Sequence, residues 1–473
     1  MASPNISFEQ IPASIRKPGK YFEFNTKLAV RTLPSNLQRV LVVGQRLMGG
    51  TVPALTPVDV FDDEQAALSF GRGSIAHLMA KAAITANPYV PLTVIAVDDD
   101  EEGIEATGTL TLAGGIAGLG LATVYIAGER VDVSVDSDAT ITEVATALTV
   151  AINAAQGLPV TATNEAGVIT VKARHKGASG NGIALVANTT VKGLTITVED
   201  MDEGDLDPDL APAFAAVFAS GYELIALPFT TAESLGALRN HLEAVGSPME
   251  QRDALGFAGW PGALAAGTTL AGDINSGLIT IGWHNGSVRT PGEIAAGYAA
   301  VVSSEEDPAR PLNTLEIKGL DITPVPDRPG RVEQENALHN GLTPLEVGPG
   351  NRVQIVRSIT TYTQDAQGTE DISLLDLTTM RTLHYIRKAC KTRVDLRFPR
   401  EKLSSRTAKK VRSELLDVLV KMEELEIVEE VEATAPGLVV ERDLQDPNRL
   451  DAAIPADIVN GLHVFAGRID LLL

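Results

Sequence analysis

Residues Gly44–Thr51 (GQRLMGGT) have the spacing of a phosphate-binding loop and directly follow an apolar strand pattern. In such a loop a lysine before the final Ser or Thr contacts the terminal phosphates, but Gly50 occupies that position here. Arg46 likewise stands at the middle glycine position of a dinucleotide-binding fingerprint. We interpret the segment as a strand-to-loop turn. A nucleotide-dependent α/β enzyme is retained only as a less favoured alternative.

The sequence supports a metal site or a catalytic nucleophile no better than it supports a nucleotide-binding loop. A calcium loop starting at Asp200 would place Gly204 at position 5 and Asp205 at position 6, where the EF-hand pattern needs a ligand and then glycine. The seven histidines form no HExxH motif or Cys/His cluster. Cys390 lies among basic residues that could lower its pKa, but no histidine partner is evident. We predict a protein that is not an enzyme, with no catalytic residue, metal site or cofactor.

Alternating strand and helix patterns predict the scaffold. Units of this length imply an α/β fold with a mostly parallel or mixed sheet and helices on both faces. The expected strands are 38–43, 92–97, 222–227, 255–258 and 278–283, and the expected helices are 61–70, 74–86, 213–219, 232–245 and 291–302.

Residues 99–209 interrupt this alternation. Acidic stretches flank the segment, Tyr125 is its only aromatic residue, and Thr, Val, Ala and Gly dominate. Thr140 and Glu143 form a capping-box pattern at the start of an expected helix over 141–155. We predict an inserted, β-rich α+β domain with strands at 107–112, 123–126, 130–135, 168–173, 183–186 and 194–198.

The predicted organisation has five parts. An extended N-terminal arm covers 1–38, and the α/β core combines 39–98 with 210–340 around the insertion at 99–209. A C-terminal domain covers 341–460, and a terminal strand or arm covers 461–473. Residues 303–350 are rich in Pro and charge, which predicts connections with short strands.

Composition limits the function classes. A chain of 473 residues is too long for one core. We expect no membrane insertion, since no apolar run is long enough to span a bilayer, and no signal peptide is recognised. One cysteine suits synthesis in a reducing cytoplasm. The net charge of −22 argues against direct nucleic-acid binding.

Charge is strongly polarised near the C-terminus. The stretch from Arg381 to Arg412 holds twelve Lys/Arg against two acidic residues, and an acidic helix is expected at 413–431. Such polarisation is typical of a surface that meets another charged surface. The alternatives are a solvated helical face or pairing between the two segments inside the subunit.

Both ends of the chain carry candidate linking segments. Prolines exclude a long helix in the first 38 residues, where the apolar anchors are Tyr21, Phe22 and Phe24. The last residues have a strand pattern that must be paired internally or by a neighbour. Its apolar members are Leu462, Val464, Phe465, Ile469, Leu471 and Leu473.

A series of ordered motifs runs along nearly the whole chain outside the insertion. The motifs are Arg39–Arg46, Phe70–Ser74, Asn87–Leu92, Asn351–Tyr362, Gly368–Asp371, Leu375-Asp376, Phe398–Arg400 with Lys402-Leu403, Val440–Arg442, Asp446–Arg449 and Val459–Leu462. In this order they resemble the tail sheath proteins of contractile-tailed bacteriophages, in particular those of Mu-like phages. The segment 404–410 is more basic and poorer in glycine than this family leads us to expect.

The resemblance implies a structural subunit of a virion tail, made in the host bacterial cytoplasm. Such subunits form six-membered rings stacked helically around a tail tube, and their arms add strands to neighbouring subunits. Contraction drives the tube through the host envelope without consuming a nucleotide. The implied partners are other copies of the chain, the tail tube protein, and the baseplate and tail terminator proteins. A headless, tailocin-like injection machine is the alternative.

The resemblance also implies that the inserted domain points outward and that the C-terminal helical region faces the tube. The expected tube-facing basic residues are Arg387, Lys388, Lys391, Arg393, Arg397, Arg400, Lys402, Arg406, Lys409, Lys410 and Arg412.

Overall fold

The computed structural model describes residues 16–22, 33–404 and 406–471. Chain contacts divide the protein into two compact units. The core unit contains residues 36–386, 426–430 and 456–473, and the helical unit contains residues 1–35, 387–425 and 431–455. The segment 343–355, which we had expected to lie in the C-terminal domain, contributes strands to the sheet of the core unit.

The core unit is built on an eight-stranded mixed sheet with the order β15-β14-β13-β12-β11-β1-β3-β2. The strands from β14 to β3 in this order are parallel, whereas β15 and β2 are antiparallel to their neighbours. The bounds are β1 Val40–Gln45, β2 Val58–Val60, β3 Leu92–Val97, β11 Leu224–Ala226, β12 Leu255–Trp260, β13 Ile279–Trp283, β14 Thr343–Gly348 and β15 Arg352–Ile355.

Helices cover both faces of this sheet, and each face has its own apolar core. Along β1, Val40 and Val42 join one core, and Leu41 and Val43 join the other. The first core contains α1 Asp63–Phe70, α2 Ile75–Ala86 and α7 Pro291–Ser303. The second contains α4 Ala211–Val217, α5 Ala232–Val245, α6 Leu264–Ile274 and part of α8 Arg331–His339. The predicted α/β class is confirmed.

The inserted region has a third apolar core of its own. One sheet has the order β10-β4-β8-β7 and a second has the order β6-β5-β9. The helix α3 begins with the predicted capping box, in which Thr140 and Glu143 bond reciprocally, and it buries Val144, Leu148 and Ile152. The bounds are β4 Glu105–Gly114, β5 Gly120–Ile126, β6 Glu129–Val135, α3 Ile141–Ala154, β7 Val160–Glu165, β8 Val168–Lys176, β9 Leu185–Thr189 and β10 Leu194–Asp202.

The helical unit contains the C-terminal part of α9 Leu377–Arg397 together with α10 Thr407–Glu424. Helix α10 buries an apolar stripe with helical spacing, formed by Val411, Leu415, Val418, Leu419 and Met422. The unit also holds α11 Val431–Thr434 and a hairpin of β17 Val439–Arg442 and β18 Leu450–Ala453. The short strands β16 Val428–Glu429 and β19 Asp457–Ile458 pair in the core unit.

Several expected elements differ from the structure. The segment 303–350 contains the helix α8 and the strand β14 as well as connections. Helix α6 and strand β7 were not expected, and the acidic helix starts and ends earlier than 413–431. That helix ends where Glu426 adopts a positive φ of 55°.

Candidate intersubunit surfaces

The loop Gly44–Thr51 uses its backbone donors within the chain. Leu47 N–H donates to Phe70 O at 2.9 Å, and Thr51 N–H donates to Leu68 O at 3.1 Å. A Cβ at Gly50 would lie 2.6 Å from Ser69 O, so the loop packs tightly on the end of α1. A phosphate cradle needs these N–H groups free. The segment is therefore a strand-to-loop turn, as predicted, and it packs tightly against α1.

The side chains considered above for metal binding or nucleophilic chemistry do not gather at one site among the described residues. Within the described residues, no group of three or more His, Cys, Asp or Glu side chains is placed to hold a metal ion. Cys390 is buried, and this burial raises the pKa of its thiol to about 11, despite the opposing effect of Arg393. The thiol is therefore protonated and unreactive at neutral pH.

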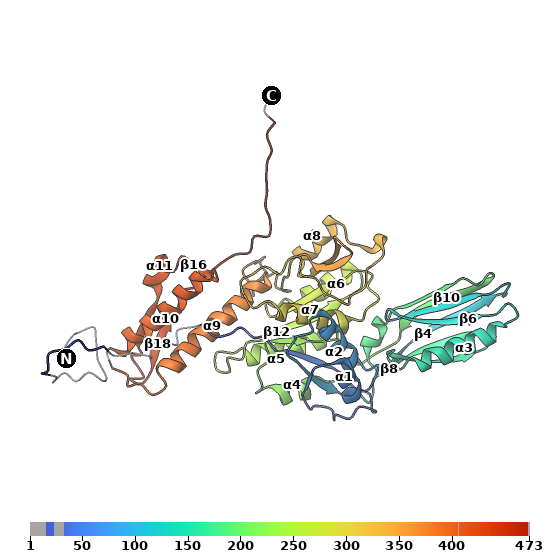
Figure 1. The fold of residues 1–473 in the computed structure, drawn as a ribbon, viewed down its shortest axis with the longest axis horizontal. Coiled ribbons are helices and arrows are strands. Elements are labelled where there is room, and N and C mark those ends of the chain that lie inside the picture. Colours follow the sequence, from blue (N-terminus) through green and yellow to red (C-terminus); the bar gives the residue numbers. More distant parts are fainter. Residues whose placement is uncertain (1–15, 23–32, 405, 472–473) are drawn as a thin grey trace. The chain divides into compact units, whose positions relative to one another are not determined.

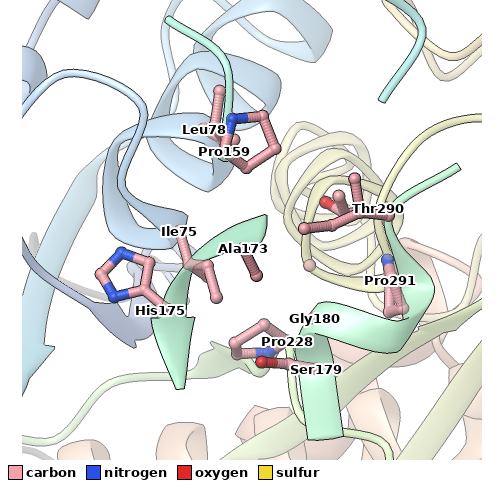
Figure 2. A pocket seen from close by; sticks show the side chains of 12 residues that line it. Ile75, Leu78, Pro159, Ala173, His175, Ser179, Gly180, Pro228, Thr290 and Pro291 are labelled. Atoms are coloured by element: carbon pink, nitrogen blue, oxygen red, sulfur yellow. The ribbon is translucent and has the colours of Figure 1, made fainter. Parts of the chain in front are cut away.

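A small cavity lies between the core helices and the base of the inserted domain (Figure 2). Its lining is mainly apolar and includes Ile75, Ala173, Pro228 and Pro291. His175 Nδ1 lies 2.8 Å from Asp99 Oδ1, and Gln45 Nε2 donates to the same carboxylate oxygen at 2.9 Å. These contacts join the inserted domain to the end of β1. The arrangement fits a structural junction better than a ligand site.

The C-terminal segment is the most exposed apolar part of the described chain. Phe465 is 86% exposed, Ile469 is 99% exposed and Leu471 is 81% exposed. Leu462 and Val464 are also exposed, and Leu473 lies outside the described residues. No strand is assigned between 459 and 471, and Figure 1 shows this segment as an extended trace. Its apolar side chains therefore have no cover within the described part of the subunit.

The N-terminal anchors are only partly described. Tyr21 is exposed and donates its hydroxyl to Lys17 O at 3.1 Å. Phe22 is 88% exposed, and Phe24 lies outside the described residues. The two described aromatic anchors thus have the same exposed character as the C-terminal segment.

The basic residues of the C-terminal region separate into two groups. Arg393 is only 4% exposed and donates to Asp417 Oδ2 at 2.6 Å and Glu414 Oε2 at 3.1 Å. Arg397 lies 3.5 Å from the same glutamate. Arg412 donates to the carbonyl oxygens of Leu438 and Ala435, both at 2.7 Å.

These contacts show which members of the expected tube-facing set have partners inside the subunit. Arg393, Arg397 and Arg412 are engaged inside the helical unit, because α10 supplies acidic partners and the chain before β17 supplies carbonyl groups. Lys388 is half-buried. The members that remain exposed are Arg387, Lys391, Arg400, Lys402, Arg406, Lys409 and Lys410.

The hairpin of β17 and β18 is a candidate that the sequence analysis missed. Within the described residues these strands pair only with each other, so each has an outer edge without a neighbouring strand. Helix α10 packs against β17. The available signal was a pair of short segments, 439–442 and 450–453, on either side of the polar turn 443–449, and we had used this region only as a family motif.

Comparisons with known proteins agree on one family. The model of the phage tail sheath central domain matches residues 195–361, and the model of the phage tail sheath C-terminal domain matches residues 369–471. A Mu-like prophage tail sheath protein from Haemophilus influenzae is 33% identical over 99% of this chain and 100% of the relative. The chain belongs to the phage tail sheath family.

Solved sheath structures share the fold. The sheath tail protein of Listeria innocua is 13% identical with a TM-score of 0.52, over 92% of this chain and 94% of that one. The contracted helical sheath of the anti-feeding prophage is 10% identical with a TM-score of 0.51, over 97% of this chain and 99% of that one.

Family membership defines the role of the protein. It is a subunit of a contractile tail sheath and a component of a phage-type tail. No helix in the described part of the chain is long and apolar enough to cross a bilayer. A tailocin-like machine would use the same kind of subunit.

Replacing Arg393 with alanine should destabilise the helical unit. The change leaves Glu414 and Asp417 without their shared cation, and we expect a loss of about 2–3 kcal/mol because these partners remain partly solvated. Hydrogen exchange of peptides from α9 and α10 would report the loss. Lys391→Ala, an exposed change on the same helix, is the matched control. Equal exchange in the two variants would contradict the role of Arg393.

Acidification should weaken the same contact. Burial alone would raise the pKa of Asp417, but hydrogen bonds from Arg393 and Lys421 outweigh burial and lower that pKa below its usual range. A carboxyl with a lowered folded-state pKa stabilises the fold above its unfolded pKa, near 3.9. That contribution is lost as the pH falls through the folded-state pKa. The protection of α10 amides relative to their intrinsic exchange rates should therefore fall below about pH 4, and less so in Arg393→Ala.

Proposed function

We propose that this sheath subunit polymerises as six-membered rings stacked helically around a tail tube. Contraction of the stack then drives the tube through the host envelope for genome delivery. The observation that carries the proposal is an exposed, extended C-terminal segment in a protein that also has a hairpin with open edges. Together they supply the two halves of a strand exchange between neighbouring subunits.

The second half of the arm, residues 465–471, has two distinct faces in an extended strand, whereas its first half is apolar on both faces. Phe465, Ile469 and Leu471 lie on one face, and Arg468 and Asp470 lie on the other. Arg468 Nε donates to Asp470 Oδ1 at 2.7 Å on the polar face. An arm strand would therefore bury its aromatic and aliphatic face and leave its charged face in water.

Apolar burial decides whether such an arm binds. Each backbone hydrogen bond contributes about 1 kcal/mol net, whereas ordering each residue costs roughly 1–2 kcal/mol. Backbone pairing alone therefore gives little. Burying each large apolar side chain adds about 2 kcal/mol. The exposed apolar face of residues 465–471 is thus the main source of affinity in the proposal.

The hairpin of β17 and β18 is the proposed acceptor. A two-stranded hairpin is marginally stable in water and gains from additional strands. Its unpaired edges present the N–H and C=O groups that a neighbour's arm needs. The N-terminal arm, with Tyr21 and Phe22, would link subunits in the same way. Such heterologous contacts repeat along a helical stack.

The exposed basic residues are the proposed tube-facing surface. They include Lys402, Arg406 and Lys409 near the start of α10. Ion pairs between exposed groups are individually weak and are screened by salt. Contacts of this kind would hold the sheath on an acidic tube and still allow it to slide during contraction.

Further assignments follow from the same proposal. The inserted domain would point outward, and the baseplate and tail terminator would contact the two ends of the stack. We propose that the protein is not an enzyme, since contraction of a metastable stack requires no nucleotide. Titration with ATP and NAD should give no binding, and micromolar affinity would revive the alternative enzyme.

Removal of residues 462–473 should yield folded but separate subunits. The deletion removes the apolar face of the arm and leaves the described cores intact. Sedimentation and negative-stain microscopy would compare tube formation with the full chain. The control, Arg468→Ala with Asp470→Ala, changes only the polar face and should still assemble. Tubes formed equally well by the shortened chain would refute strand exchange through this arm.

Charge reversal should separate tube binding from self-assembly. Lys402→Glu, Arg406→Glu and Lys409→Glu together should reduce co-assembly with tail tubes, because attraction to an acidic surface becomes repulsion. Tube-free polymers of the sheath should still form. The control carries Lys192→Glu, Lys318→Glu and Arg331→Glu, which are equally exposed positions elsewhere. Equal co-assembly of the two triple variants with tubes would contradict the electrostatic assignment.

A further inference from the structure

The inserted domain packs other elements against the edge strands of both its sheets. The edge strands β9 and β10 pack against each other, and α3 packs against the edge strands β6 and β7. A subunit that exchanges strands needs such protection, because any open edge competes for a neighbour's arm. The most detailed protection lies at β7.

One side chain occupies the outer edge of β7. Asn153, at the end of α3, donates from Nδ2 to Ala162 O at 2.7 Å and accepts from Ala162 N–H at 2.9 Å through Oδ1. In an antiparallel pair, alternate residues direct both backbone groups away from the partner strand. Ala162 is such a residue, paired across from Val171 of β8. The amide of Asn153 therefore takes the place that a neighbouring strand would occupy.

The next backbone carbonyl along this edge is also covered. Arg174 Nε donates to Val160 O at 3.1 Å. Farther along, Asn164 Nδ2 donates to Thr146 Oγ1 of α3 at 3.1 Å, a contact that involves no backbone group of β7. Asn153, Thr161 and Thr163 are all exposed, so the edge lies at the surface, where another chain could reach it.

We propose that Asn153 is a specificity-determining residue of strand exchange that prevents β7 from accepting a neighbour's arm. The inference rests on the proposed exchange of arms between subunits. The hairpin of β17 and β18 has open edges and receives the arm, whereas β7 is closed by Asn153. Arms are thereby directed to one acceptor, which a regular helical stack requires.

Two substitutions distinguish this role from simple stabilisation. Asn153→Ala frees both backbone groups of Ala162 and leaves a neutral edge. Asn153→Asp can still accept from Ala162 N–H but places a negative charge beside the carbonyl, and charge at an edge opposes strand addition. If Asn153 only holds α3 against β7, the effect of each variant should follow its loss of stability alone. If Asn153 instead blocks strand addition at β7, only Asn153→Ala should bind a neighbour's arm there.

The test uses the full chain with a photo-crosslinking phenylalanine analogue at Arg468, on the polar face of the arm. Without a further change, crosslinks should map to residues 439–453. In Asn153→Ala, crosslinks to residues 160–165 should appear, together with irregular aggregates in negative stain. Asn153→Asp and the control Asn164→Ala should add none. Hydrogen exchange at Ala162 should accelerate roughly fivefold in Asn153→Ala, the factor supplied by one hydrogen bond of ordinary net strength.

Each outcome bears on a separate claim. Crosslinks confined to 439–453 in the alanine variant, with faster exchange at Ala162, would overturn the role of Asn153 and leave strand exchange intact. New crosslinks at 160–165 in both the alanine and aspartate variants would also overturn it. An absence of arm crosslinks to the hairpin in the otherwise unchanged chain would refute the proposed exchange itself.

Discussion

Backbone N–H and C=O groups at strand edges are the constraint on which this structure depends. A buried edge must be paired, and an exposed edge attracts other strands. In the large sheet, the edge strand β15 is covered by hydrogen bonds from Thr314 and Ile317 to its carbonyls, and β2 is only three residues long. In the inserted domain, Asn153 of α3 occupies both backbone groups of Ala162 at the edge strand β7. The hairpin of the helical unit has no neighbouring strand among the described residues.

The basic side chains of the helical unit fall into a buried, paired group and an exposed group. Arg393 is buried among Glu414 and Asp417 and holds α9 to α10. Lys402, Arg406 and Lys409 remain in water. The internal pairs stabilise the unit because Arg393 is buried against both carboxylates, and its loss would leave Glu414 paired with Arg397 and Asp417 paired with Lys421. The exposed basic residues contribute little to the stability of the fold, so substitutions there could adapt the sheath to a different tube surface without unfolding it.

Helices and strands could be predicted from the sequence where their pattern of apolar residues matches the side chains that are buried in the structure. Strand β3 and helix α5 have the predicted bounds, since an apolar run and an amphipathic stripe identify them. Helix α6 was missed because Gly267 and its threonines have low helix propensity. Its glycine is explained only by packing, since a Cβ there would lie 2.8 Å from Trp260 Cδ1. The burial of Arg393 was equally hidden, because its acidic partners are more than twenty residues away.

A sheath that contracts must preserve some contacts while it releases others. Strand exchange suits the preserved contacts, because its hydrogen bonds and alternating side chains fix one register and tolerate rotation only in the extended segment outside the pairing. Attraction between exposed charges suits the released contacts, because it needs no fixed geometry and falls off with salt. In the proposed sheath these two kinds of interaction lie on different surfaces. The exposed apolar residues 465–471 form the proposed arm, and Lys402, Arg406 and Lys409 lie near the start of α10. Such a separation would allow subunits to move along a tube without leaving one another.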